Sequence, residues 1–275
     1  IKRLIDDDLI NQKISVVWHA GEPLTIPIDF YIETFNRIKQ IVPLNIKVYH
    51  NIQTNATLIN QEWCDLIINE NISIGVSIDG PKDINDLNRL TRSGKSTYEQ
   101  VLKGIDLLKK NSIPFHIISV ISKQSLKHGK DLFEFFVEIG ANRICLNIEE
   151  IEGVHHNSSL ELNEETDIIF KEFYQTIYDL QNNPSNNLEV REITNAKNKI
   201  LNIPLNYFKL NDFGQQLRPF GIITIDTFGN FSTFSPELIG HKNNEYKDFI
   251  LGNVYECSFK ESISSAVFSK IYTDI

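Results

Sequence analysis

Short β-rich runs alternate with helical runs through the first two-thirds of the chain. Strands are predicted at Ile14–His19, Ile46–Asn51, Ile72–Ile78, Pro114–Ile121 and Arg143–Ile148. Between them, apolar residues at three-to-four spacing predict amphipathic helices at Ile28–Ile41, Gln61–Asn69, Thr97–Lys110 and Gly129–Ile139. Capping signals for these helices stand at Asn60, Ser96 and Gly140. Repeated βα units of this kind indicate an α/β fold with neighbouring parallel strands covered on both faces.

The pattern changes after Ile148. Helices are predicted over Glu161–Gln181 and Leu188–Leu201, separated by a polar loop, and a hairpin is predicted over Gly221–Phe234 with its turn at Phe228-Gly229-Asn230. Antiparallel structure after parallel units suggests a second segment. We therefore expect a barrel-like domain over residues 1–210 and a differently built segment over 211–275.

Composition places the chain among globular proteins. Of the 275 residues, 41% are hydrophobic and 23% are charged. The formal net charge of −9 argues against nucleic-acid binding, which needs a clustered field of Lys and Arg. No apolar run is long enough to span a bilayer, and Ile1–Asp8 does not form a signal peptide, so we expect a cytoplasmic protein with no membrane partner.

The three cysteines, Cys64, Cys145 and Cys257, lie far apart and form neither a disulfide framework nor a local metal motif, so no residue of this sequence is assigned as a metal ligand. The chain has no methionine and starts at Ile1, which suggests an excerpt of a longer protein.

Polar residues gather where the predicted strands end, the edge at which barrels carry their sites. The first strand runs into Ala20-Gly21-Glu22-Pro23, a turn whose exposed backbone can grip a small polar ligand. The second strand ends in Gln53-Thr54-Asn55, and the third ends in Ser77-Ile78-Asp79. Arg89 follows and suits bidentate capture of a carboxylate, although a surface ion pair with Asp83 or Asp86 is the alternative.

The fifth strand runs into an acidic segment that contains Glu149, Glu150 and Glu152, followed by His155 and His156. Such a segment suits a metal site, a proton relay or a wall that binds a basic peptide, or it is simply a solvated loop. Its spacing matches no metal motif.

Four elements lie at the expected rim of the barrel: Ala20–Pro23, Gln53–Asn55, Ser77–Asp79 and Arg89. Taken in this order, they resemble the radical S-adenosylmethionine (SAM) enzymes of the SPASM subfamily, which have a partial (β/α)6 barrel. Ala20-Gly21-Glu22-Pro23 resembles their Gly-Gly-Glu-Pro element, with Ala20 replacing the first Gly. The resemblance implies cofactor-binding roles for the residues Ala20, Gly21, Glu22, Pro23, Gln53, Asn55, Ser77, Asp79, Arg89 and Leu146. Gly229-Asn230-Phe231 and Leu251-Gly252-Asn253-Val254 resemble the start of a SPASM domain.

The resemblance also implies a [4Fe–4S] cluster bound by a Cys-x3-Cys-x2-Cys loop, expected before Ile1, and auxiliary clusters whose ligands are expected after Ile275. Within the subfamily, Asn147–Gly153 and Phe231–Leu238 resemble the maturases that install cyclophane crosslinks in ribosomal peptides. In sulfatase-activating relatives a cluster Cys and a catalytic Asp stand where this chain has Phe234 and Ser235. That departure counts against formylglycine formation.

The implied reaction is hydrogen abstraction from a substrate β-carbon, attack of the carbon radical on an aromatic ring, and loss of an electron and a proton. The partners implied are a precursor peptide and an electron donor such as flavodoxin or ferredoxin. Glu149, Glu150 and Glu152 are the catalytic candidates, because they line the expected peptide channel. Other radical modifications, such as thioether formation or epimerisation, remain open.

Two other classes compete with this interpretation. An iron-free barrel lyase or aldolase would use Glu149, Glu150 or Asp79 as acid or base, but it needs a catalytic Lys or a metal triad at the strand ends, which we do not find. A peptide-binding scaffold without clusters is the non-enzymatic alternative. It has no need of Gly21, Ser77 and Arg89 together.

Overall fold

The computed structural model describes residues 1–149, 158–160, 163–202 and 215–274. Its main sheet has six parallel strands in chain order, β1-β2-β3-β4-β5-β6. They span Lys13–Trp18, Lys47–Thr54, Ser73–Ser77, Phe115–Ile121, Arg143–Ile148 and Glu189–Val190. The five strands predicted from sequence are all present, adjacent and parallel, which confirms the α/β class and the partial-barrel arrangement.

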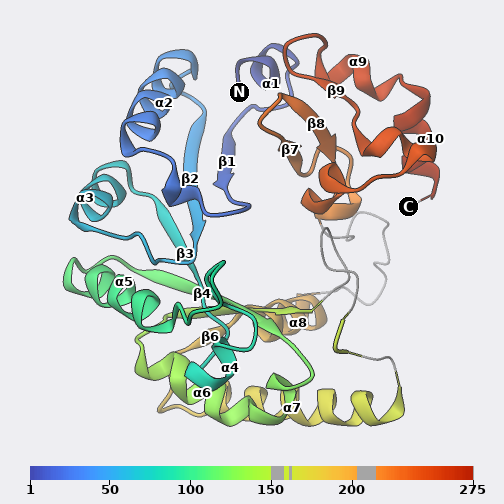
Figure 1. Ribbon diagram of the computed structural model, residues 1–275. Helices are drawn as coiled ribbons and strands as arrows, with labels where there is room; N and C mark the ends of the chain where they lie inside the picture. The colour runs from blue at the N-terminus through green and yellow to red at the C-terminus, as the bar shows by residue number, and fades with distance from the viewer. Residues whose placement is uncertain (150–157, 161–162, 203–214, 275) are drawn as a thin grey trace.

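Helices follow the strands and cover one face of the curved sheet (Figure 1). The prediction of two covered faces is wrong for the inner face, where side chains such as Gln53 and Ser73 are exposed. The principal helices are α2 (Ile28–Ile41), α3 (Gln61–Glu70), α5 (Tyr98–Lys110), α6 (Gly129–Glu138), α7 (Glu164–Asn182) and α8 (Arg191–Asn202). The shorter elements between them are η1 (Pro23–Thr25), α4 (Lys82–Asn85) and η2 (Ser125–His128). None of the helices in the described ranges is both long and apolar enough to cross a membrane.

The two faces of the sheet differ because side chains alternate along each strand. Ile52, Ile74, Ile117 and Ile144 are buried between the sheet and its helices. The residues between these positions face the open inside of the barrel. Asn51 of β2 and Ser73 of β3, which pair with each other in the sheet, are examples. This burial builds the core and leaves polar groups free inside the barrel.

Local capping signals explain where two helices begin and end. Asn60 caps α3, because its side chain accepts a hydrogen bond from the Trp63 N–H at 2.9 Å. Gly140 ends α6 with φ +81°, and the N–H groups of Gly140 and Ala141 bond back to Val137 and Phe136, a Schellman motif. Both predictions are confirmed.

The prediction at Ser96 is wrong by one residue. The N-cap of α5 is Thr97, and it makes no side-chain cap. The Ser96 hydroxyl still accepts a hydrogen bond from the Tyr98 N–H at 3.2 Å, so it satisfies one of the free donors at the start of the helix.

The single helix predicted over Leu188–Leu201 is also wrong at its start. Glu189 and Val190 form β6, which pairs with Arg143 and Ile144 of β5, and only then does α8 begin. A two-residue strand is too short to show a period of two in the sequence. The βα alternation therefore continues for one more unit than expected.

A second unit follows, with a three-stranded antiparallel sheet of β7 (Ile223–Ile225), β8 (Asn230–Thr233) and β9 (Gly252–Asn253). The hairpin predicted from the sequence is confirmed. The remaining elements of this unit are η4 (Gln215–Leu217), η5 (Pro236–Gly240), η6 (Asn244–Phe249), α9 (Phe259–Ile263) and α10 (Ala266–Asp274).

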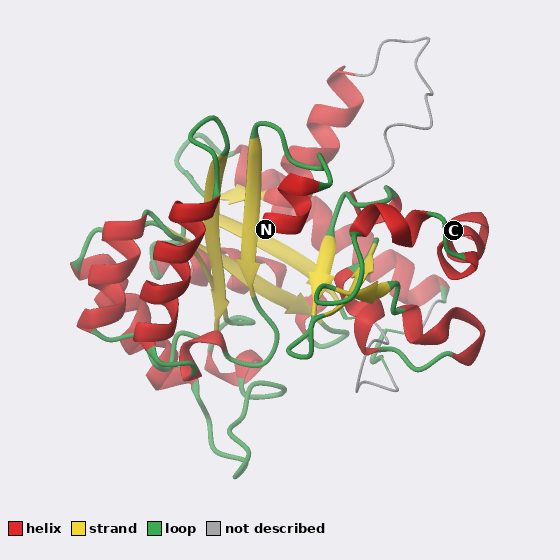
Figure 2. Cartoon of the chain, turned by 90° about the horizontal axis from the view of Figure 1, so that it is seen from above, coloured by secondary structure: helices red, strands yellow, loops and turns green. Residues whose placement is uncertain are grey.

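The beginning of the chain packs against this second unit. Leu4, in α1 (Lys2–Asp6), shares a buried cluster with Phe231, Phe259 and Phe268. Figure 1 shows α1 beside the C-terminal elements, and Figure 2 shows the end of the chain across the sheet from the first barrel helices. The expected division at residue 211 stays a prediction, because residues 203–214 lie outside the described part.

Candidate functional site

The loop after β1 places exposed backbone at the carboxyl edge of the sheet. Ala20 and Gly21 both have left-handed backbone conformations, with φ of +72° and +61°. A Cβ atom built on Gly21 would meet no other atom within 4 Å, so the space beside it is open. Pro23 is buried and starts η1. The peptide groups at Ala20 and Gly21 are therefore available to a ligand, whereas the Pro23 ring is part of the core.

Glu22 fastens this loop to the end of β2. Its Oε1 accepts hydrogen bonds from the Leu24 N–H at 3.0 Å and the Thr54 hydroxyl at 2.6 Å. Its Oε2 accepts a hydrogen bond from the Asn55 N–H at 2.7 Å. The half-buried carboxylate thus sets the distance between two rim elements, and it does not point freely at a ligand.

Tyr31 holds the same loop from beneath. Its hydroxyl, in a side chain that is 2% exposed, donates a hydrogen bond to the Pro23 carbonyl at 3.0 Å. Burial, with a further contribution from the negative charge of Glu22, raises the pKa of Tyr31 to about 12. The phenol therefore stays a donor at physiological pH.

The middle strands present the hydrogen-bonding side chains that face the barrel interior. Gln53 pairs in register with Gly75, and Ser77 follows Gly75 by two residues, so all three lie on one face. Gln53 is exposed and Ser77 is half-buried. Neither side chain has a hydrogen-bond partner among the described residues. Asn55 is partly committed, because its Oδ1 accepts hydrogen bonds from the N–H and the hydroxyl of Thr57.

Asp79 and Arg89 form an ion pair beyond β3. Arg89 Nε lies 2.7 Å from Asp79 Oδ2, and Arg89 Nη2 donates a hydrogen bond to Asp79 Oδ1 at 2.8 Å. The expected alternative partners, Asp83 and Asp86, are not used in this way, and Asp86 instead pairs with Lys82. Arg89 therefore lies at the rim with part of its guanidinium engaged.

The fifth strand, β5, and the segment after it contribute fewer side chains to the candidate site than the sequence suggests. Leu146 is 3% exposed and packs on the helix-covered face, so its side chain does not join Gln53 and Ser77. The Glu149 carboxylate accepts hydrogen bonds from the N–H and hydroxyl of Ser159 and from the Ser158 hydroxyl. Glu150 and Glu152 lie outside the described residues. The catalytic role of these acids stays a prediction.

The described residues do not supply a metal centre. No three His, Cys, Asp or Glu side chains in that part of the chain are grouped to hold a metal ion. Cys64 and Cys145 are buried and Cys257 is partly buried, each as a free thiol. Burial raises the pKa of Cys64 and of Cys145, which disfavours their thiolate forms.

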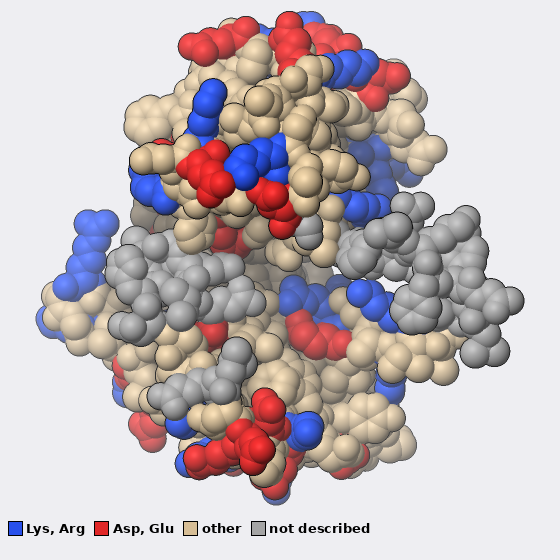
Figure 3. All heavy atoms as spheres, turned by 90° about the vertical axis from the view of Figure 1, so that its right-hand side faces the viewer, with Lys and Arg blue, Asp and Glu red and all other residues tan. Residues whose placement is uncertain are grey.

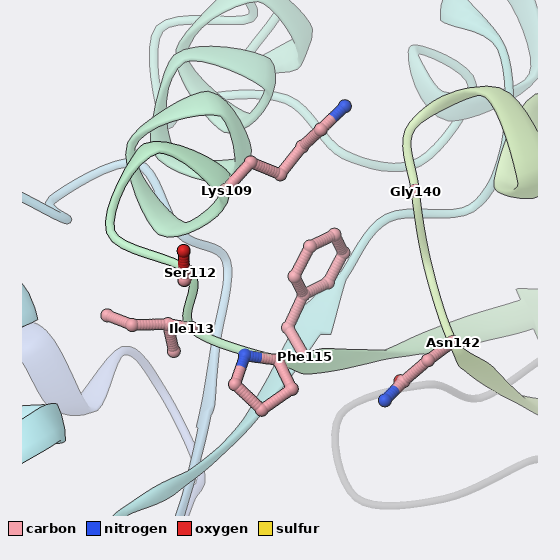
Figure 4. Close-up of a pocket in the computed structure, with 7 residues that line it drawn as sticks. Lys109, Ser112, Ile113, Phe115, Gly140 and Asn142 are labelled. Carbon is pink, nitrogen blue, oxygen red and sulfur yellow. The ribbon is translucent and has the colours of Figure 1, made fainter.

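Two hollows lie at the opposite, amino-terminal end of the strands. One of about 260 Å³ is lined by residues that include Lys109, Phe115 and Gly140, and Figure 4 shows these residues around it. The other, of about 510 Å³, is lined by residues that include His116 and Arg143.

Figure 3 shows a separate feature, a recess in the face of the molecule seen in that view, with acidic and basic side chains inside it.

Comparison with known proteins fits this geometry. The sequence profile of the radical SAM superfamily matches residues 1–136, the part that carries β1 to β4 and the rim residues up to Arg89. This part of the chain belongs to the radical SAM superfamily. The barrel described above is thus a radical SAM partial barrel.

Two curated relatives extend the comparison. The uncharacterized Synechocystis protein sll1766 is 35% identical over 266 residues, which cover 95% of this chain and 65% of that protein. A cysteine-type anaerobic sulfatase-maturating enzyme of Clostridium novyi is 32% identical over 136 residues, or 50% of this chain and 36% of the enzyme. This chain therefore spans less than two thirds of the length of either relative.

Solved structures show the same fold along nearly the whole chain. The structure of anSMEcpe with bound AdoMet has a TM-score of 0.78 at 21% identity and covers 98% of this chain and 68% of its own. Streptococcus suis SuiB, bound to the precursor peptide SuiA, has a TM-score of 0.66 at 15% identity, over 95% of this chain and 56% of its own.

Sequence reasoning missed the residues that hold the radical SAM rim in shape. Thr54 and Tyr31 fasten the first loop, and the Val120 N–H fixes Asp79. One signal was available, because Thr54 is a polar residue in a strand position that alternation assigns to the core, and a buried hydroxyl needs a partner. A backbone donor such as the Val120 N–H leaves no mark in the sequence.

Proposed function

We propose that this chain is the central part of a radical SAM enzyme that modifies a ribosomally made precursor peptide. The observation that carries the proposal is the open rim of the superfamily barrel, where the Ala20-Gly21 backbone, Ser77 and Arg89 offer groups for a small amino-acid-bearing cofactor. SAM held there would supply radical chemistry, which can take hydrogen from an unactivated carbon.

The described residues fit SAM chemically. The free carbonyl and N–H groups at Ala20 and Gly21 suit an ammonium and its neighbours, and the unpaired hydroxyl of Ser77 and amide of Gln53 suit a ribose. Arg89 supplies a cation for the carboxylate. The role of these residues is to bind and orient SAM and to exclude water.

The described residues do not fit the cluster, because Cys64, Cys145 and Cys257 are not grouped. We place its ligands in a Cys-x3-Cys-x2-Cys loop of the longer protein ahead of Ile1, and those of auxiliary clusters beyond Ile275. The partial coverage of the relatives leaves room for both segments. Flavodoxin or ferredoxin is the proposed electron donor.

A peptide substrate is supported by the structural neighbours. Structures of anSMEcpe contain the Cp18Cys peptide, and SuiB was solved with SuiA. The curated relatives include anaerobic sulfatase-maturating enzymes. We therefore propose that a peptide substrate binds at the open face of this barrel.

The finer proposal is a carbon–carbon cyclophane crosslink between an aromatic side chain and a nearby β-carbon. Phe234 is 1% exposed and packs against Phe268 at 6.2 Å between ring centroids, while the Ser235 hydroxyl donates a hydrogen bond to Glu237. A phenyl ring and a hydroxyl at these positions cannot replace a cluster thiolate and a catalytic carboxylate. This supports a reaction other than formylglycine formation.

Mass spectrometry of the peptide encoded beside this gene, after reaction with reduced full-length enzyme and SAM, tests the proposal. A crosslink makes the product lighter by the mass of two hydrogen atoms and suppresses fragmentation inside the ring. Formylglycine formation from Cys turns the CH2–SH group into an aldehyde, so the peptide loses one sulfur and two hydrogen atoms and gains one oxygen, and epimerisation leaves the mass unchanged in ordinary water. An unshifted mass contradicts crosslinking, and no change of any kind contradicts the enzymatic proposal.

A further inference from the structure

The loop after β3 brings a buried carboxylate against a cation at the rim. The Asp79 side chain is 5% exposed and the Arg89 side chain is 24% exposed. Nε of Arg89 lies 2.7 Å from Oδ2 of Asp79, and Nη2 donates to Oδ1 at 2.8 Å. A carboxylate this deeply buried needs a cation, since its unpaired burial would be costly.

Asp79 is also fixed from the other side. Its Oδ1 accepts a hydrogen bond from the Val120 N–H on β4 at 2.9 Å, and its own N–H donates to Oδ1 of the fully buried Asn85 at 3.3 Å. Asn85 in turn accepts the Arg89 N–H through its backbone carbonyl at 2.9 Å. The carboxylate is thus directed at the protein, which leaves it poorly placed to bind a cofactor itself.

The contact uses only one edge of the guanidinium. Nε and Nη2 lie on the side that faces Asp79, although the Nε–H is not aligned well enough to form a hydrogen bond there. Within the described ranges Nη1 has no partner. A guanidinium has five N–H donors in a rigid plane, so the Nη1 and Nη2 fork stays able to grip a second carboxylate.

We propose that Asp79 is a positioning residue, which holds the Arg89 guanidinium so that its free fork meets the carboxylate of SAM. This inference rests on the proposed function and changes the role expected of Asp79 from cofactor ligand to support. Long Arg side chains lose considerable rotamer entropy on binding. An ion pair that fixes the side chain beforehand removes part of that cost.

A purely structural ion pair is the competing explanation. It would tie α4 and its following loop to β4 and would affect every ligand equally. A positioning role acts only on ligands that carry the carboxylate. Two related probes separate the cases: S-adenosylhomocysteine, which has the amino-acid end, and methylthioadenosine, which lacks it.

The experiment is calorimetry on the full-length, cluster-reconstituted protein with each probe. For Asp79→Asn we expect affinity for S-adenosylhomocysteine to fall by about tenfold, and affinity for methylthioadenosine to change by less than about twofold. In an Arg89→Ala background Asp79→Asn adds no further loss, because the effect passes through Arg89. Asp79→Glu, which keeps the charge, restores part of the discrimination.

Asp86→Asn is the matched control, since Asp86 lies on the same loop and pairs with Lys82 and not with Arg89. It should leave the ratio of the two affinities unchanged.

Equal loss for both probes, or an unchanged ratio in Asp79→Asn, overturns the positioning role. If Asp79→Asn unfolds, Arg89→Lys is the second variant: its single ammonium lacks the fork, and retained discrimination overturns the proposal. A wild-type protein that binds neither probe overturns the proposed function as well.

Discussion

Glu22 and Asn55 are joined by a hydrogen bond of 2.7 Å from the Asn55 backbone N–H to Oε2 of Glu22. They are 33 residues apart in the chain, and they connect the loop after β1 with the end of β2. A residue of the Gly-Glu-Pro turn therefore stabilises the shape of the rim, and the backbone beside it is what remains for a ligand.

Glu22→Gln should lower the free energy of unfolding by about 1–3 kcal/mol. Both carboxylate oxygens accept hydrogen bonds, but a glutamine has one acceptor oxygen, so its NH2 group would face a donor. Glu33→Gln is the control, because Glu33 is exposed on α2 and its partner among the described residues is Arg37, one turn along the same helix. Urea denaturation measures both variants, and equal losses would contradict the role given to Glu22.

Ala20→Gly should raise the free energy of unfolding by roughly 1 kcal/mol. Ala20 has φ +72°, a left-handed conformation that costs an alanine more than a glycine. The same substitution at Ala196, an exposed position inside α8, should lower stability by about 1 kcal/mol, since glycine weakens a helix interior. Thermal unfolding of the two variants should thus shift in opposite directions, and a destabilised Ala20→Gly variant would show that the turn tolerates the methyl group.

Much of the barrel could be read from the sequence because its signals are local and periodic. The strands β1 to β5 and the cap at Asn60 follow from alternation and from side-chain chemistry within four residues. The short strand β6 could not be read, since Glu189 and Val190 join the sheet only through pairing with β5. Tertiary contact decides their conformation.

The candidate site was less predictable for a related reason. The sequence shows which polar residues stand near strand ends, and Gln53 and Ser77 do share one face. It does not show which of them the protein uses internally. Glu22 bonds to Thr54 and Asn55, and Glu149 bonds to Ser159, which are contacts between segments distant in the chain or formed by loop geometry.

Alkaline pH should destabilise the protein through Tyr31. Its pKa is about 12 when folded against an ordinary value of 10.0, so between these values the unfolded chain has lost a proton that the folded chain keeps. The contribution of Tyr31 to the free energy of unfolding is fully present below pH 10. It falls as pH rises toward 12, by up to about 2–3 kcal/mol. Tyr31→Phe should be about 1 kcal/mol less stable at neutral pH, because the hydrogen bond to the Pro23 carbonyl is lost. Its free energy of unfolding should fall less steeply as pH rises above 10, because the variant has no phenol at this position. Tyr255→Phe, with a ring 80% exposed, serves as the control in pH-dependent denaturation.

The contact between the beginning and the end of the chain gives the last prediction. Oδ2 of Asp7, a residue 9% exposed, accepts hydrogen bonds from the N–H groups of Phe259 at 2.7 Å and Lys260 at 3.3 Å, the first residues of α9. A carboxylate there satisfies free helix donors and faces the positive end of the helix. Asp7→Ala should therefore cost about 1–3 kcal/mol and open the C-terminal unit to protease before the barrel.

Asp6→Ala is a control one residue away, since Asp6 is exposed and, in the part of the chain that the structure describes, pairs with Lys2 of the same helix. It should cost less than about 0.5 kcal/mol and leave the cleavage pattern unchanged. Limited proteolysis followed by mass spectrometry locates the first cuts. First cuts within α2 or α3 in Asp7→Ala would show that the N-terminal segment stabilises the barrel and not the C-terminal unit, because Asp7 contacts α9 and neither of those helices.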